Sequence, residues 1–98
     1  MFATPADVPV NAHAAATTTI KLVDNKFRPA RKTVKRGTTL RFLWTGKNPH
    51  NVFVVSGPVN FHSGTKTKGS YRKRVTRKGS YALVCTIHSG MTLRLKVS

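Results

Sequence analysis

Residues 80–97 read SYALVCTIHSGMTLRLKV, and this stretch decides the fold because two alternating segments flank one short loop. In the first segment, Tyr81, Leu83 and Cys85 fall on one face of an extended chain. In the second segment the apolar residues also share one face: Met91, Leu93, Leu95 and Val97. Side chains alternate between the two faces of a β-strand. The stretch therefore predicts two strands, each with one buried face, joined through residues 86–90.

The same alternation continues toward the N-terminus. Residues 39–44 place Leu40, Phe42 and Trp44 on one face, as is typical of a half-buried strand. Other short segments, separated by turn residues, stand at 18–23, 51–55 and 71–76. No segment shows sustained helical periodicity. Six to eight short strands at this spacing predict an all-β fold, a Greek-key antiparallel β-sandwich.

The chain has 98 residues, which is enough for one domain with a single core. We expect that domain to span residues 18–98 and residues 1–17 to form a flexible N-terminal tail or processed linker. The tail lacks the basic start and apolar region of a signal peptide, although AHAAA at 12–16 is similar to a cleavage region. No apolar run is long enough for a transmembrane helix.

The composition is strongly basic. Eighteen Lys and Arg residues stand against two acids, Asp7 and Asp24, for a formal charge of +16. A field of this sign favours an acidic protein partner, an anionic membrane or cell surface, or nucleic acid. Two separated carboxylates leave little material for paired acid and base chemistry, so a hydrolytic enzyme is disfavoured. Strong self-repulsion favours a monomer.

The loop after residue 84 gathers metal-ligand chemistry. Cys85, His88 and Met91 stand three residues apart, so a tight loop can turn their side chains toward one point. A thiolate, two imidazoles and a weak thioether are the ligands of a blue copper site. The second histidine has to come from elsewhere, and the best candidate is His50 in PHNV. His62 follows in a glycine-bearing loop, where a surface position is expected.

PHNV at 49–52 together with SYALVCTIHSGM at 80–91 resembles the cupredoxins, the type 1 blue copper proteins of the plastocyanin, pseudoazurin and amicyanin group. The resemblance covers residues 18–98. It implies one copper ion cycling between Cu(I) and Cu(II), held by His50, Cys85, His88 and Met91. It also implies that Asn51 ties the two ligand loops together beside the sulfur. Ile87 departs from the family, where relatives commonly carry proline.

The resemblance further implies a small electron-transfer protein that shuttles single electrons between redox partner proteins. It is not expected to be an enzyme, because four protein ligands leave little room for a substrate on the metal. A periplasmic or other extracytoplasmic location is expected, with the export signal absent from this sequence. A redox partner is expected to dock on an apolar patch around the edge of His88, with these members: Pro49, Pro58, Ile87 and Gly90.

Alternative interpretations stay open from the residues alone. Cys85 and Met91 could each be ordinary core residues, and only the complete set argues for ligation. The same set could serve copper storage or delivery. The charge could instead belong to a basic β-barrel that binds nucleic acid. No specific nucleic acid is expected, since Phe42 and Trp44 are in phase with the core. The basic surface could steer an acidic partner or simply maintain solubility.

Overall fold

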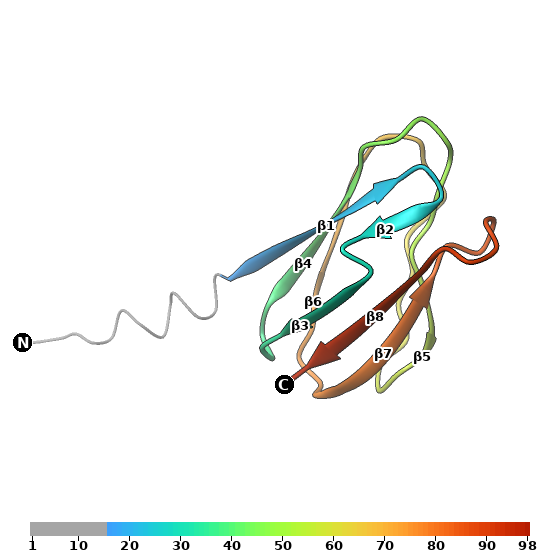
Figure 1. Cartoon of the computed structure of the whole chain (residues 1–98). Helices are drawn as coiled ribbons and strands as arrows, with labels where there is room; N and C mark the ends of the chain where they lie inside the picture. The colour runs from blue at the N-terminus through green and yellow to red at the C-terminus, as the bar shows by residue number, and fades with distance from the viewer. Residues whose placement is uncertain (1–15) are drawn as a thin grey trace, which may run out of the picture.

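The structure is a computed structural model that describes residues 16–98, which form eight β-strands and no helix (Figure 1). The strands are β1 (Thr17–Val23), β2 (Lys26–Arg28), β3 (Arg31–Val34), β4 (Thr39–Trp44), β5 (Phe53–Ser56), β6 (Gly69–Arg74), β7 (Gly79–Val84) and β8 (Thr92–Val97). Over these residues there is accordingly no helical segment that could cross a membrane. The expected division at residue 17 stays a prediction, because residues 1–15 lie outside the described part of the chain.

The strands form two sheets of four, in the orders β2-β1-β4-β6 and β3-β8-β7-β5. The predicted all-β sandwich is confirmed. The sheets are mixed, however, and not purely antiparallel, because β1 pairs with β4 and β3 pairs with β8 in parallel. The reason lies in the connections. The chain changes sheet at every connection from β2 to β7, so neighbours within a sheet are often not consecutive in sequence.

The core lies between the two sheets and contains the residues that the alternation selects. Leu40, Phe42 and Trp44 on β4 are buried, and so are Tyr81 and Leu83 on β7. The inward residues of β8 and its preceding loop are buried as well: Met91, Leu93, Leu95 and Val97. Burial of apolar surface on this scale is the main stabilising contribution to such a domain.

Strand direction brings three distant segments to one end of the sandwich. β1, β4 and β7 all run toward this upper pole, which is formed by residues 24–25, 45–52 and 85–91 (Figure 1). β3 and β8 run away from it, toward a lower pole that includes residues 35–38 and the last residue, Ser98. The upper pole therefore collects both segments that carry the predicted ligands.

Candidate metal centre

Three of the predicted ligand side chains meet at the upper pole. Nδ1 of His50 lies 3.2 Å from Nδ1 of His88, and Sγ of Cys85 lies 3.5 Å from Nδ1 of His88 and 3.9 Å from Nδ1 of His50. Among the described residues, these three form the one group of three or more His, Cys, Asp or Glu side chains placed to hold a metal ion. His50 and Cys85 are buried, whereas His88 is half-buried.

The separations of these atoms fit a metal ion. A point equidistant from three atoms so arranged is about 2.1 Å from each, close to the roughly 2.0–2.3 Å of imidazole and thiolate bonds to a divalent metal. Two imidazole nitrogens facing one another across 3.2 Å leave at least one lone pair directed into the space between them. One soft sulfur and two imidazoles are the donor types that copper prefers. The residues present therefore fit copper.

The backbone around His50 holds this side chain in place. His50 exchanges two backbone hydrogen bonds with Lys66, at 3.0 and 3.1 Å, which pins it to the long 57–68 connection. The indole Nε1 of Trp44 donates to the His50 carbonyl at 2.9 Å in the buried interior. His50 itself is fully buried. The core thus encloses the side chain of His50, and an isolated β-bridge to Lys66 fixes its backbone.

The loop that carries the other predicted ligands is closed by its own backbone. The amide of Cys85 donates to the Met91 carbonyl at 3.0 Å, and the amide of Met91 donates to the His88 carbonyl at 3.3 Å. Gly90 adopts φ of 82°, in the left-handed region that glycine enters without strain. Met91 is buried, with 1% of the residue exposed. The turn thus orients the loop while keeping the methionine inside the molecule.

Asn51 connects the two ligand segments. Its side-chain Oδ1 accepts from the Thr86 amide at 2.9 Å, and its Nδ2 donates to Thr86 Oγ1 at 2.8 Å and to Thr65 Oγ1 at 3.3 Å. Its backbone amide points at Sγ of Cys85 at 3.5 Å. A donor at this position stabilises negative charge on the sulfur. These contacts connect the segment of His50 to the loop of Cys85.

Asp24 is a site residue that the sequence analysis did not single out. Its Oδ1 accepts from the amides of Lys47 and Asn48 at 2.8 and 2.9 Å and lies 3.5 Å from Nε2 of His50. The contact with His50 is too loose to count as a hydrogen bond, and this buried nitrogen has no closer hydrogen-bond acceptor among the described residues. The amide of Asn48 is the main cause that lowers the pKa of Asp24 below its ordinary value of 3.8.

The position of Asp24 explains both its effect and why it was missed. The carboxylate lies on the side of the His50 ring opposite Nδ1, so it favours a proton on Nε2 and a free lone pair on Nδ1. The only sequence signal was that Asp24 is an isolated acid in a turn after an apolar strand. Nothing local shows that this turn reaches the residues before His50.

The predicted apolar patch is correct in part. Pro49, Ile87 and Gly90 are exposed at the upper pole, and Ile87 is 48% exposed. The inclusion of Pro58 was wrong. A Cβ at Gly79, which begins β7 at its lower end, would lie 2.6 Å from Cγ of Pro58, so this proline belongs to the opposite end of the sandwich. The reason is that β5 carries the chain away from the ligands before residue 58 is reached.

Two further residues bear on the alternatives. His62 is exposed, as predicted, and its ring packs against Phe53 with centroids 6.0 Å apart. Phe61 is buried, so it is not available as a platform for stacking nucleic-acid bases. His13 lies outside the described residues. Phe61 therefore contributes nothing to the exposed aromatic surface that a basic nucleic-acid-binding barrel needs.

Solved structures with the same fold include several copper proteins. A purple cupredoxin from Nitrosopumilus maritimus superposes with a TM-score of 0.74 at 18% identity, covering 83% of this chain and 99% of that one. Pseudoazurin from Hyphomicrobium denitrificans gives 0.72 at 26% identity, covering 85% and 76%. A copper-containing nitrite reductase from Thermus scotoductus SA-01 gives 0.74 at 26% identity and covers 84% of this chain. The chain spans about a fifth of that reductase, since it covers 22% of its length.

Sequence comparison places the chain in a family. No curated protein sequence matches it at a significant level. The profile of the family described as copper binding proteins, plastocyanin/azurin family, matches residues 14–98, which includes the whole described sandwich. The match covers both segments that meet at the upper pole. The chain therefore belongs to the plastocyanin/azurin family of copper-binding proteins.

Proposed function

We propose that this protein carries single electrons between redox partner proteins through one copper ion held by His50, Cys85, His88 and Met91. The observation that carries the proposal is the convergence of Nδ1 of both histidines with Sγ of Cys85 at one pole of the sandwich. Copper bound there would supply a reversible one-electron couple.

The surrounding residues suit this task because they hold the ligands before any metal arrives. His50 is fixed by Lys66 and Trp44, and the loop of Cys85 is fixed by its own backbone bonds and by Asn51. A site that changes little between two oxidation states needs this kind of support. Cys85 would lose its thiol proton on loading, so copper affinity should rise with pH.

Burial of the ligands supports electron transfer over storage or delivery. His50 and Cys85 are closed off by the core, while His88 is half-buried next to the exposed Ile87 in the same loop. A partner that contacts this surface reaches the edge of His88 without touching the sulfur. We propose an acidic redox partner, because the chain carries a charge of +16. A periplasmic or other extracytoplasmic location and a monomeric state belong to the same proposal.

We also propose that the protein is not an enzyme. Here the described residues supply one carboxylate side chain, that of Asp24, and it is engaged by two backbone amides. A catalytic site would need a second acid or base and an open metal position. The sandwich offers a buried ligand set instead.

The test is to add one equivalent of Cu(II) to metal-free protein and record the visible absorption spectrum. We expect an intense thiolate-to-copper band that is absent in Cys85→Ser and preserved in His62→Asn, which changes an exposed histidine outside the ligand group. A band that survives Cys85→Ser would overturn the ligand assignment. Fast electron self-exchange in the loaded protein would favour electron transfer, and slow exchange with ready loss of copper to an acceptor would favour delivery.

A further inference from the structure

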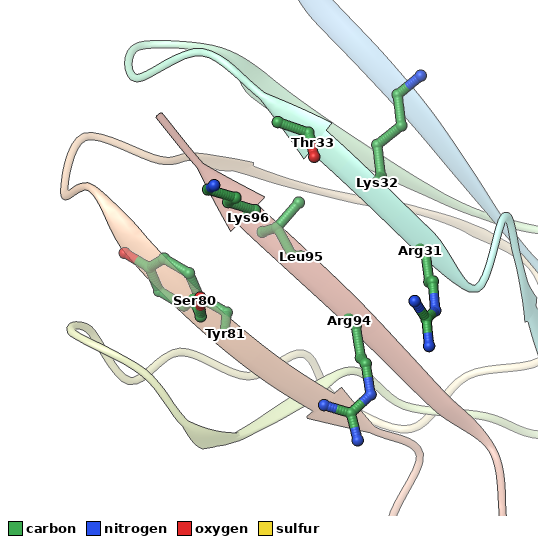
Figure 2. A pocket seen from close by; sticks show the side chains of 8 residues that line it. All are labelled: Arg31, Lys32, Thr33, Ser80, Tyr81, Arg94, Leu95 and Lys96. Atoms are coloured by element: carbon green, nitrogen blue, oxygen red, sulfur yellow. The ribbon is translucent and has the colours of Figure 1, made fainter.

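The outer surface of the sheet formed by β3, β8 and β7 carries basic residues in register. Arg31 lies directly opposite Arg94 in the parallel ladder, and Thr33 lies opposite Lys96. On the other side of β8, Ser80 also lies opposite Lys96. Figure 2 shows the Arg31 and Arg94 side chains extending to the same side of the sheet. We call these five residues the outer basic face.

This arrangement is unfavourable without a counter-charge. Like charges directly opposite one another across a ladder destabilise a sheet. The one acidic side chain among residues 16–98 is that of Asp24, which lies at the upper pole with the amides of Lys47 and Asn48. It belongs to the other sheet's β1–β2 turn. Two guanidinium groups thus face solvent side by side, with no acidic side chain of the described chain to compensate them.

The outer basic face also lines a hollow. The hollow has a volume of about 240 Å³, and its walls include Lys32, Tyr81 and Leu95 in addition to the five residues named above (Figure 2). The side chains of Tyr81 and Leu95 are buried in the core on the inner side of the sheet, so these two residues give the hollow a fixed floor of strand backbone. The rim offers two guanidinium groups, an ammonium and two hydroxyls, all of which can donate hydrogen bonds.

We propose that this hollow binds a phosphate group, either free or as the headgroup of a lipid. Arginine presents a fork of N–H donors that matches the oxygens of a phosphate, and two neighbouring arginines can engage two of its edges. Lys96 adds a point charge, and Ser80 and Thr33 add neutral donors at the same rim. A bound phosphate anion offsets the repulsion between Arg31 and Arg94 and so stabilises the folded chain. The site is separate from the copper ligands and does not depend on the metal.

The other sheet supplies a matched control. Arg41 of β4 lies directly opposite Arg72 of β6, which repeats the like-charge pair on the opposite outer face. Removing either pair lowers the net charge by the same amount. Only the pair Arg31 and Arg94 belongs to the hollow. A difference between the two double variants therefore separates a built site from general attraction to a polycation.

The experiment measures the affinity for inorganic phosphate by calorimetry, at constant ionic strength set with chloride, on the full chain. We expect R31Q/R94Q to bind phosphate about ten-fold more weakly than the unchanged protein, and R41Q/R72Q to bind within a factor of about two. R31K/R94K, which keeps the charge, should be weakened as well because lysine lacks the fork. Circular dichroism checks that each variant is folded.

A second arm distinguishes the two sources of phosphate. Vesicles of phosphatidylcholine with phosphatidylglycerol are compared with vesicles of phosphatidylcholine alone. Binding to the anionic vesicles that R31Q/R94Q loses and R41Q/R72Q keeps, with no affinity for inorganic phosphate, identifies a lipid headgroup as the ligand. Equal losses in both double variants, or no binding in either arm, overturn the proposal. Should a variant fail to fold, phosphate-induced NMR shifts in the unchanged protein decide, because the site predicts shifts at Ser80 and Lys96 and none at Arg72.

Discussion

Replacing Asn51 by alanine tests how far the link between the two ligand segments stabilises the upper pole. The change removes three side-chain hydrogen bonds, two to Thr86 and one to Thr65. Each is worth about 0.5–1.5 kcal/mol net, and because Asn51 is half-buried we take the lower part of that range, about 1.5–2 kcal/mol in total. For a domain of this size the melting temperature should fall by roughly 6–16 °C.

The assay is urea unfolding of the metal-free protein followed by circular dichroism, with thermal unfolding alongside. Asn48→Ala is the control, because the side chain of Asn48 makes a single hydrogen bond of 3.5 Å, to Asn25 on the exposed surface. Asn48→Ala should lower the free energy of unfolding by less than about 0.5 kcal/mol. Adding Thr86→Ala to the Asn51 variant should cost little more, since the partner is already gone. If Asn51→Ala were no more destabilising than Asn48→Ala, the connecting role would be refuted.

Three further changes probe other parts of the structure. Leu83→Ala should lower the free energy of unfolding by about 2–5 kcal/mol, because the side chain is fully buried; a smaller loss in urea unfolding would contradict the described core. Gly79→Ala should destabilise by about 1–3 kcal/mol, since φ is +143° and the new Cβ would lie 2.6 Å from Pro58; thermal unfolding measures this. The pKa of Asp24 is lowered chiefly by the amide of Asn48, so its contribution is complete above the ordinary value of 3.8 and is lost as pH falls through the lowered pKa. Asp24→Asn should therefore flatten the dependence of the free energy of unfolding on pH in the acid range. An unchanged slope would contradict the assigned role of Asp24.

The sequence predicted the strands and their buried faces well because both depend on local alternation. Leu40, Phe42 and Trp44 are buried as their period of two requires. The short spacing from Cys85 to His88 likewise placed two of the predicted ligands on one loop. In both cases the residues that determine the structure lie within a few positions of one another in the sequence, so their pattern can be recognised without knowing the fold.

The parts that could not be predicted depend on which strands become neighbours. The alternation of apolar and polar residues predicts which face of β1 is buried. It does not predict that β1 pairs in parallel with β4. The same limit applies to Asp24, which meets His50 only because the β1–β2 turn lies at the upper pole. It also applies to Pro58, which the direction of β5 carries to the lower pole.

The opposed directions of β7 and β8 have a practical consequence for attaching the protein to other objects. Ser98 follows β8 at the lower pole, beside Val34, while His88 lies at the upper pole beyond the other end of the same strand. A linker fused after Ser98 would leave the half-buried edge of His88 facing outward. Immobilising the chain on an electrode through such a linker should therefore leave the upper pole, with its predicted copper ligands, facing the solution. A partner protein fused after Ser98 would have to fold back along the full length of the sandwich to reach that pole.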